Sequence, residues 1–293
     1  MAKIGFIGTG TMGTPMVRCL AGNGYTPCVY DIFATAARNA ASADSLQLAS
    51  SVSSLGNDAS IAILMLPNSS IVRSVCVDSD GLASAMKPGS IILDMSSSNP
   101  VETRKLGKEL AKRHLTLLDA PVSGGVRKAI SGTLAIMLGG DNETALTTVL
   151  PILETMGTVY RAGSLGAGHA TKALNNYVSA AGLTAACEAL LIGREFGLDP
   201  QRMTDIFNAS TGRNNSTENK ISQFILSGDF KSAGFNLELI AKDLSLAEGL
   251  SRQSGTPLPG VAATAQLWRQ ANEALESGAD HTEIFRYIES LTQ

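Results

Sequence analysis

The sequence predicts an α/β fold with a mostly parallel sheet, followed by an all-helical domain. From Met1 to about Arg161, apolar runs of strand length alternate with helical patterns, which is typical of a parallel sheet covered by helices on both faces. After Gly163, β-branched runs give way to Ala, Leu, Asn and Glu at helical spacing. A chain of 293 residues is long enough for two cores. We therefore expect a first domain over 1–163 and a second over 164–293.

The first element predicts a dinucleotide-binding loop. The apolar run KIGFI is followed by G-T-G-T-M-G and then by a helical pattern. Gly8 permits a tight turn, Gly10 lets backbone N–H groups approach a pyrophosphate, and Gly13 lets the helix press against the sheet. The helix start adds partial positive charge for the phosphates. The residues expected to contact the cofactor are Gly8, Thr9, Gly10, Thr11, Met12 and Gly13. This pattern predicts a Rossmann-type domain.

The next strand is expected at Thr26–Tyr30, and the acid after it bears on the choice of cofactor. The Asp31 carboxylate can accept hydrogen bonds from both ribose hydroxyls of NAD. The 2′-phosphate of NADP would meet like charge there, and Ile32 and Phe33 offer no compensating cation. The sequence therefore predicts NAD, and the degree of tolerance for NADP stays open.

Further strands continue the series. They are expected at Ile61–Met65, Ser90–Asp94, Thr116–Ala120 and Thr133–Gly140. The first three run into loop-forming residues, at 67–68, 96–100 and 121–125. Ligands of open α/β sheets bind at the carboxyl ends of the strands. These loops are therefore expected to line the site.

The second domain is expected to contain only helices. Its first helix should run from Ala167 to about Phe196, with Gly197 as the C-cap, and about 30 residues correspond to about 45 Å. Such a helix would join the two halves and is a candidate surface for a homodimer or homotetramer. Asp199-Pro200 is typical of a helix start. Further helices are expected at Gln201–Ala209, Leu237–Ser254, Val261–Ser277 and Thr282–Leu291.

Composition favours a small-molecule ligand. The net charge of −3 and the lack of a long Lys/Arg cluster argue against a nucleic-acid partner. The four cysteines lack C-x-x-C spacing, so buried free thiols are expected rather than disulfides or a metal site. The longest apolar segment, Tyr177–Ile192, contains Glu188 and is too short to span a membrane, and Met1 leads directly into a strand. We therefore expect a cytoplasmic protein without a membrane partner.

Candidate catalytic residues follow the domain junction, where pockets tend to form. Lys172, Asn175 and Asn176 lie at i, i+3 and i+4 and therefore on one helix face. When a hydride reaches a carbonyl carbon, charge develops on the oxygen, which a lysine can protonate while an amide fixes the substrate. Lys242 is a candidate second cation for this chemistry or for the cofactor. The competing interpretation is that Lys172 is a solvated helix residue.

Ser123-Gly124-Gly125 admits two interpretations from its residues alone. It can be a plain turn between strands, or a nest of backbone N–H groups that binds an anion. A substrate carboxylate in such a nest would gain about 1.5–3 kcal/mol from each charge-assisted hydrogen bond. Both alternatives stay open at this point.

Four motifs occur in order along nearly the whole chain. They are G-T-G-T-M-G at 8–13, D-A-P-V-S-G-G at 119–125 with the following G-T-L-A-I-M-L-G-G, G-A-G-H-A-T-K-A-L-N-N at 166–176, and K-D-L at 242–244. In these motifs the chain resembles the β-hydroxyacid dehydrogenase family, which includes 3-hydroxyisobutyrate dehydrogenase and tartronate semialdehyde reductase. The resemblance implies hydride transfer between NAD and a small β-hydroxy acid or its semialdehyde.

The resemblance also implies roles for the residues on the substrate side. The Ser123-Gly124-Gly125 loop would hold the substrate carboxylate, which disfavours the plain turn. Lys172 would be the catalytic acid/base, and Asn176 would orient the substrate beside Asn175.

On the cofactor side, the resemblance implies that two loops flank the dinucleotide. They contain Leu66-Pro67 and Ser96-Ser97, and Lys242 would lie at the nicotinamide end. Members of the family often have Thr where this chain has Ser97, a change that keeps the hydroxyl group.

Related proteins with other activities differ from this chain at the motif residues. The related decarboxylating 6-phosphogluconate dehydrogenases have His where this chain has Asn175 and a much longer helical domain. Imine reductases share the fold but usually lack the lysine. The alternatives are thus an imine or ketimine reductase and a non-catalytic dinucleotide-binding protein, and the presence of Lys172 and Asn176 argues against both.

The identity of the substrate is expected to depend on the polar segment Ser210–Ser216 between helices of the second domain. Its amide and hydroxyl groups favour a hydroxylated substrate. Tartronate semialdehyde, a threonate-like sugar acid or serine would suit these groups better than the methyl group of hydroxyisobutyrate.

Overall fold

The structure is a computed structural model that describes residues 2–42 and 46–292. Met1 and Gln293, the outer ends of the two predicted domains, lie outside the described residues. The chain divides into two compact units, one ending at Lys172 and the other beginning at Ala173. Each unit has a hydrophobic core of its own.

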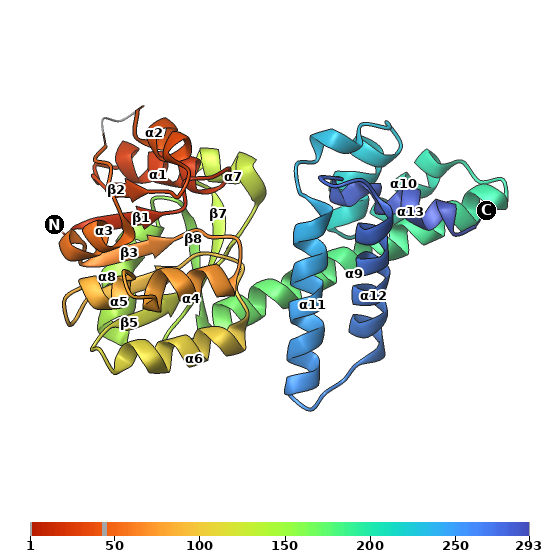
Figure 1. The fold of residues 1–293 in the computed structure, drawn as a ribbon. Helices are drawn as coiled ribbons and strands as arrows, with labels where there is room; N and C mark the ends of the chain where they lie inside the picture. The colour runs from red at the N-terminus through yellow and green to blue at the C-terminus, as the bar shows by residue number, and fades with distance from the viewer. Residues whose placement is uncertain (1, 43–45, 293) are drawn as a thin grey trace. The chain divides into compact units, whose positions relative to one another are not determined.

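The first unit is built on one sheet, which contains eight strands in the described residues (Figure 1). The strands are β1 (Ile4–Ile7), β2 (Cys28–Tyr30), β3 (Ile61–Leu64), β4 (Ile91–Asp94), β5 (Thr116–Asp119), β6 (Val122–Ser123), β7 (Leu134–Gly139) and β8 (Gly157–Gly163). Their order is β2-β1-β3-β4-β5-β7-β6, with β8 paired to β7. The pairs from β2 to β5 are parallel, whereas β7 is antiparallel to β5 and β6. The predicted mostly parallel α/β fold is confirmed.

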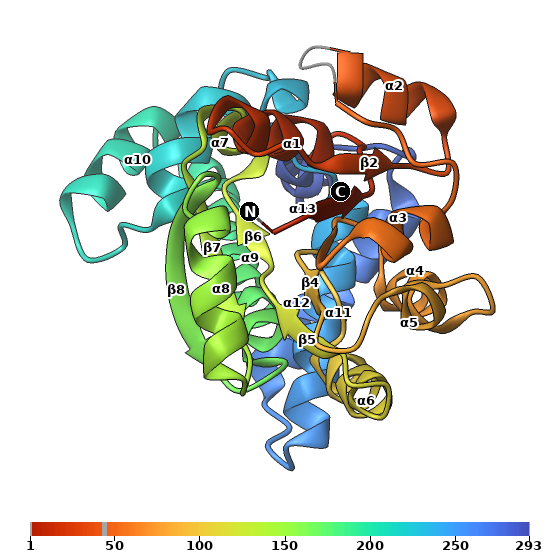
Figure 2. The same cartoon turned by 90° about the vertical axis from the view of Figure 1, so that its left-hand side faces the viewer.

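Helices cover both faces of this sheet (Figure 2). They are α1 (Gly13–Gly22), α2 (Ala34–Ser42), α3 (Val52–Asp58), α4 (Ser69–Val77), α5 (Leu82–Ala85), α6 (Pro100–Ala111), α7 (Gly125–Ser131) and α8 (Glu143–Leu153). Side chains of a strand alternate between the faces. Phe6 accordingly packs in the cluster with α1, α7 and α8, and Ile7 packs in the cluster with α3, α4, α5 and α6. Because both faces of the central strands β1 and β3 are buried, these strands are apolar throughout, which is why they were predictable.

Three strands differ from the prediction. Strand β8 (Gly157–Gly163) was not predicted, because its partly exposed residues form no apolar run. β2 begins at Cys28 rather than Thr26, because Pro27 has no N–H to donate to the ladder. The expected loop at 121–125 contains the short strand β6, in which Val122 pairs with Ile136 and Ser123 with Ala135. A two-residue strand has no periodicity, so only the pairing with β7 reveals it.

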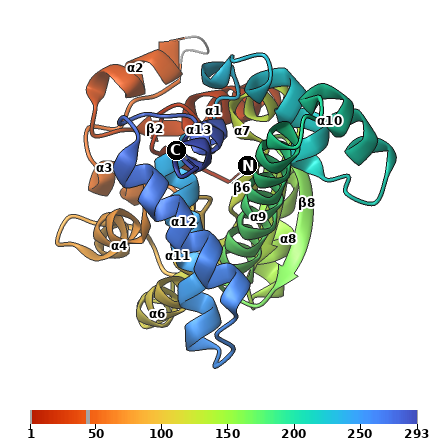
Figure 3. The same cartoon turned by 90° about the vertical axis from the view of Figure 1, so that its right-hand side faces the viewer.

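The second unit is all helical in the described residues, as predicted. Its elements are α9 (Ala167–Glu195), which begins in the first unit, α10 (Pro200–Ala209), the π-helix η1 (Thr217–Ile225), the 3₁₀-helix η2 (Phe230–Ser232), α11 (Leu237–Gln253), α12 (Pro259–Ala274), the 3₁₀-helix η3 (His281–Glu283) and α13 (Ile284–Ser290). Helices α11 and α12 lie side by side (Figures 1 and 3). The core includes Trp268, which is fully buried and donates to Thr184 Oγ1 at 3.0 Å.

The boundaries of the predicted helices are close to those observed, but the short 3₁₀-helix η2 and the π-helix η1 were not predicted. Gly197, the expected C-cap of α9, has a φ of 90°, which suits glycine. The π-helix η1 was not predicted, because its i to i+5 pattern gives no recognisable apolar period in T-E-N-K-I-S-Q-F-I. Within the described chain, no helix combines the length and apolar character needed to cross a membrane.

Candidate active site

The three glycines of the predicted cofactor loop have different surroundings. A Cβ on Gly8 would lie 2.2 Å from the Met65 carbonyl oxygen, and Gly8 has a φ of 96°. A Cβ on Gly13 would lie 1.9 Å from the Gly8 carbonyl oxygen. By contrast, a Cβ on Gly10 would meet no atom within 4 Å. The fold therefore requires glycine at the first and third positions, and Gly10 keeps open space beside the start of α1. This arrangement fits a bound dinucleotide.

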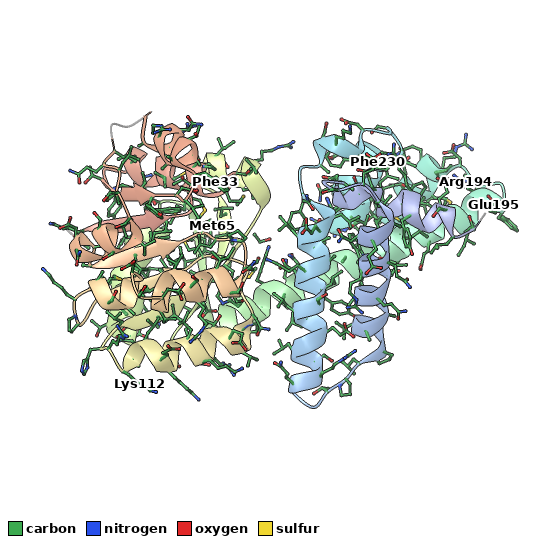
Figure 4. All side chains as sticks on the ribbon, viewed as in Figure 1. Phe33, Met65, Lys112, Arg194, Glu195 and Phe230 are labelled. Carbon is green, nitrogen blue, oxygen red and sulfur yellow. The ribbon has the colours of Figure 1, made fainter. Side chains whose placement is uncertain are left out.

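The predicted ribose-binding acid is held in place by backbone donors. Asp31 accepts hydrogen bonds from the Thr9 N–H at 2.7 Å and the Phe33 N–H at 2.9 Å. Thr9, which belongs to the cofactor loop, is itself buried. Ile32 and Phe33 are 81% and 73% exposed, and Figure 4 shows Phe33 on the first unit. Asp31 thus has a fixed orientation, and the two residues that follow it are apolar and exposed.

Hydrogen bonds join the two loops predicted to flank the cofactor. The Leu66 N–H donates to Ser96 Oγ at 2.9 Å, and the Ser96 N–H donates to Asp94 Oδ1 at 2.9 Å. The structure therefore brings Leu66 and Ser96 together at the carboxyl ends of β3 and β4. Pro67 and Ser97 follow them directly in the chain.

The Ser123-Gly124-Gly125 segment forms a sharp bend between β6 and α7. Gly124 has a φ of 133° and Gly125 a φ of 67°, so both positions favour glycine. A Cβ on Gly124 would lie 2.6 Å from Lys128 Cδ, because the lysine stem crosses the bend. The close packing at Gly124 and the two positive φ angles explain why glycine occupies both positions.

Of the three residues predicted on one face of α9, two are buried. Lys172 is 9% exposed and Asn176 is 6% exposed, whereas Asn175 is exposed. Lys172 is therefore not a solvated helix residue. Asn175 donates to Asn176 Oδ1 at 3.3 Å. Burial is the environment in which a lysine can exchange a proton with a ligand rather than with bulk water.

The second unit supplies a carboxylate that sequence reasoning missed. Asn176 Nδ2 donates to Asp243 Oδ2 at 2.6 Å, and Lys242 Nζ lies 3.8 Å from Asp243 Oδ1. Asp243 is 2% exposed. The K-D-L motif contained it, but its partner lies 67 positions away in the chain. Asp243 therefore holds the Asn176 amide through one oxygen and faces Lys242 with the other.

Asp119 at the end of β5 was also given no role. Its two carboxylate oxygens accept the Gly166 N–H at 2.7 Å and the His169 N–H at 2.8 Å. These donors belong to the start of α9, so Asp119 caps the helix that carries Lys172. In the sequence, Asp119 could have been recognised as the acid at the end of a predicted strand, two positions before Pro121 in D-A-P.

The cysteines are free thiols, as expected: Cys76 and Cys187 are buried, while Cys19 and Cys28 are half-buried. Burial raises the pKa of Cys187 to about 12, so it stays protonated near neutral pH. In the described residues, no group of three or more His, Cys, Asp and Glu side chains could hold a metal ion.

Comparison with known proteins places the two parts of the chain in one family. Residues 3–166 match the profile described as the NAD-binding domain of 6-phosphogluconate dehydrogenase. Residues 166–288 match the profile described as NAD-binding of NADP-dependent 3-hydroxyisobutyrate dehydrogenase. The chain belongs to the β-hydroxyacid dehydrogenase family. It is accordingly an NAD(P)-dependent enzyme of that family, and its cofactor is a nicotinamide dinucleotide.

Relatives and solved structures agree with this assignment over the full length. The chain is 36% identical to 2-(hydroxymethyl)glutarate dehydrogenase of Eubacterium barkeri, covering 99% of this chain and 96% of the relative. It is 35% identical to the NAD-dependent L-serine dehydrogenase of Pseudomonas aeruginosa, covering 92% of each. The structure of 3-hydroxyisobutyrate dehydrogenase from Mycobacterium tuberculosis with L-serine superposes with a TM-score of 0.90 at 30% identity, covering 98% of this chain and 99% of that one.

A cavity of about 220 Å³ lies at the other end of the strands from the predicted cofactor loop. It is lined by Ser60, Gly89, Thr116, Asn142 and their neighbours, at the amino ends of β3, β4 and β5. Ligands of parallel sheets bind at the opposite, carboxyl ends. The cavity therefore lies away from the loops that the sequence predicts to bind cofactor and substrate.

Proposed function

We propose that the protein transfers a hydride between NAD and a small β-hydroxy acid or its semialdehyde, with Lys172 as general acid/base. The observation that carries this proposal is the burial of Lys172 on the same helix as the buried Asn176. When bound, the dinucleotide supplies or accepts the hydride. In the reducing direction, Lys172 Nζ donates a proton to the carbonyl oxygen, and in the oxidising direction it takes the proton of the hydroxyl group.

The remaining residues would bind and orient the substrate. Backbone N–H groups of Ser123-Gly124-Gly125 would hold the carboxylate, which the two positive φ angles support. Asn176, held by Asp243 at 2.6 Å, would donate or accept a hydrogen bond at the substrate oxygen, with Asn175 beside it. Lys242 would contact the nicotinamide end of the cofactor. A fixed amide reduces the entropy that is lost on orienting the substrate.

We further propose NAD rather than NADP as the preferred cofactor. The support is the Asp31 carboxylate, which two backbone N–H groups hold in place, and the apolar Ile32 and Phe33 that follow it. A negative charge fixed at that position disfavours a 2′-phosphate. Steady-state kinetics with both cofactors tests the preference, and a lower KM for NADP than for NAD would contradict it.

For the substrate, we propose a hydroxylated acid such as serine, tartronate semialdehyde or a threonate-like sugar acid. The segment Ser210–Ser216 supports this choice. Asn214 Oδ1 accepts the Ser216 N–H at 2.8 Å, and a Cβ on Gly182 of α9 would lie 3.4 Å from Asn214 Cγ. A polar segment therefore packs on α9 beyond Asn176. Equal kcat/KM values for serine and hydroxyisobutyrate would contradict the choice.

The central experiment replaces Lys172 by Ala and, as a matched control, replaces the exposed Lys112 by Ala (Figure 4). We expect Lys172→Ala to lower kcat by about 10²–10⁴ while the Kd for NADH stays within about threefold, because only the proton donor is lost. Lys112→Ala should behave like the wild type. A wild-type kcat in Lys172→Ala rules out the mechanism. Including cyclic imines in the same assay separates an imine reductase from a hydroxyacid dehydrogenase.

A second pair of variants tests the cofactor loop without disturbing the fold. A Cβ added to Gly10 or to Gly22 would meet no atom within 4 Å, and both residues lie at or near α1. Gly10→Ala should weaken NADH binding by about tenfold or more, since the added methyl group would occupy the space that the pyrophosphate approaches. Gly22→Ala should leave binding unchanged. Fluorescence titration with NADH measures both, and equal Kd values for the two variants would contradict the assignment.

We also propose a cytoplasmic homodimer or homotetramer. Apolar side chains on and just after α9 support association: Val178 is 68% exposed, Ile192 71% and Phe196 83%. The free cysteines suit a reducing compartment. Light scattering coupled to size exclusion measures the mass, and a monomer at micromolar concentration would contradict the oligomer.

A further inference from the structure

Two buried carboxylates and one histidine lie together at the carboxyl ends of β4 and β5. Asp94 and Asp119 occupy paired positions of these neighbouring parallel strands, and both are at most 1% exposed. The His169 side chain is fully buried. Its Nε2 lies 3.7 Å from Asp94 Oδ2, and its Nδ1 lies 3.7 Å from Asp119 Oδ2. The imidazole therefore contacts both acids.

The hydrogen bonds around His169 assign one ring proton. Thr103 Oγ1 lies 2.9 Å from His169 Nδ1 and also 3.0 Å from the Asn99 carbonyl oxygen. A hydroxyl group has one hydrogen to donate, and a carbonyl oxygen can only accept, so Thr103 donates to Asn99. His169 Nδ1 must then carry the proton and donate to Thr103, an assignment that follows from the network. Nε2 has no hydrogen-bond partner among the described residues and faces Asp94.

On one side, this cluster reaches the loops proposed to flank the cofactor. Asp94 Oδ1 accepts the Ser96 N–H, and Asp94 Oδ2 accepts the Ser98 hydroxyl at 2.7 Å. Ser96 Oγ in turn accepts the Leu66 N–H. A chain of contacts therefore runs from Leu66 to the His169 ring.

On the other side, the cluster holds the first turn of α9. Asp119 accepts the N–H groups of Gly166 and His169. The helix start is pressed closely onto the sheet, because a Cβ on Gly168 would lie 2.1 Å from the Met137 carbonyl oxygen and 2.8 Å from Asp119 Oδ2. Lys172 follows His169 by three residues, or about 4.5 Å along the helix axis. The contacts that hold the His169 ring in place therefore also hold the first turn of α9, and with it Lys172.

We propose that His169 is a positioning residue for hydride transfer: its ring, fixed by Thr103 and packed between Asp94 and Asp119, holds Lys172 in register with the cofactor-flanking loops. This inference rests on the proposed role of Lys172. An apolar side chain in place of His169 would remove the donor to Thr103 and leave the two buried acids without the imidazole between them. Small displacements of a catalytic group are costly in rate, so a change at His169 should reach Lys172 without any contact to the substrate.

The test compares His169→Leu, which removes both ring nitrogens, with His169→Asn, whose amide can take the place of Nδ1 and donate to Thr103. The control pair is His114→Leu and His114→Asn at an exposed histidine. We expect His169→Leu to lower kcat by about 10- to 100-fold with the Kd for NADH within about threefold. His169→Asn should recover most of that loss. Both His114 variants should retain the wild-type kcat.

A second variant keeps the test informative if His169→Leu does not fold. Thr103→Val is nearly isosteric and removes the acceptor of the Nδ1 proton while leaving the ring in place. It should lower kcat in the same direction as His169→Leu, and where His169→Leu folds, combining the two should add little, because both remove the same hydrogen bond. Additive losses in the double variant would overturn the proposal.

Hydrogen exchange separates this proposal from the proposed function itself. In Thr103→Val and His169→Leu, amides 166–172 should exchange faster than in the wild type, whereas Lys172→Ala should leave them unchanged. If the wild type turns over no hydroxy acid, the proposed function fails, and the exchange data still report on the positioning of α9. The positioning role is wrong if the His169 variants fold and keep kcat within twofold of the wild type, or if His169→Asn is as impaired as His169→Leu.

Discussion

The two units hold their buried charged groups in different ways. In the first unit, Asp119 is satisfied by two backbone N–H groups, one for each oxygen. In the second unit, Asp243 accepts from the side-chain amide of Asn176, and the half-buried Lys220 donates to the Ser179 hydroxyl at 3.3 Å. Backbone donors are fixed by the fold, whereas side-chain donors can rotate. Substitutions should therefore be tolerated less well in the first unit than in the second.

The largest loss of folding stability is expected for Asp119→Asn. Both carboxylate oxygens accept an N–H group, so an amide in either orientation would point its NH₂ at a donor. Gly139 and Gly168 pack closely against the carboxylate and leave it no room to move. We expect a loss of about 4 kcal/mol in the stability of the first unit, measured by urea unfolding. The exposed Asp80→Asn is the control. A loss below about 1 kcal/mol would show that the backbone adapts after all.

A somewhat smaller change in folding stability is expected as pH rises and Lys220 loses its proton. Burial lowers the pKa of Lys220 from its ordinary value of 10.5 to about 8, although the negative charge of Asp280 opposes the shift. The folded state therefore binds this proton less readily than the unfolded state. The resulting destabilisation is fully present below pH 8 and is relieved as pH rises from 8 to 10.5.

Comparison with Lys220→Met isolates this contribution. Between about pH 7 and pH 10.5, the stability of the wild type should rise relative to Lys220→Met by up to about 3 kcal/mol. Thermal unfolding across this pH range measures the difference, with the exposed Lys231→Met as the control. A difference that stays constant with pH would mean that Lys220 is solvated in the folded protein.

The smallest effect is expected for Asp243→Asn, which sharpens the contrast with Asp119→Asn. The new amide can still accept from Asn176 Nδ2 through its carbonyl oxygen, so the contact at 2.6 Å survives in a weaker, neutral form. We expect a loss of about 1 kcal/mol in stability. The exposed Glu238→Gln on the same helix is the control. If Asp243→Asn were as damaging as Asp119→Asn, the proposed difference between backbone and side-chain donors would be wrong.

The residues that sequence reasoning recognised act through neighbours close in the chain. Gly8, Gly10 and Gly13 follow a strand directly, and Asp31 ends the next strand, so spacing alone revealed them. The same holds for Lys172 and Asn176, which share one helix. Their burial, by contrast, could not be predicted, because a helix face is buried or exposed only once other elements pack on it.

The residues that were missed have distant partners. His169 meets Thr103 across 66 positions, and Asp119 meets Gly166 across 47. Each residue type taken alone is ordinary, and three scattered histidines gave no reason to single out His169. The short strand β6 and the π-helix η1 escaped for a related reason, since neither is long or periodic enough to leave a pattern.

The sequence by itself determined the α/β fold, the helical second unit and the family, because apolar periodicity and glycine spacing act over a few residues. Only the tertiary structure decided that Lys172 is buried, that Asp243 orients Asn176, and that His169 lies between two acids. Desolvation and hydrogen bonding depend on which groups are brought together in space. Residues far apart in the chain acquire these properties only when the strands and helices pack.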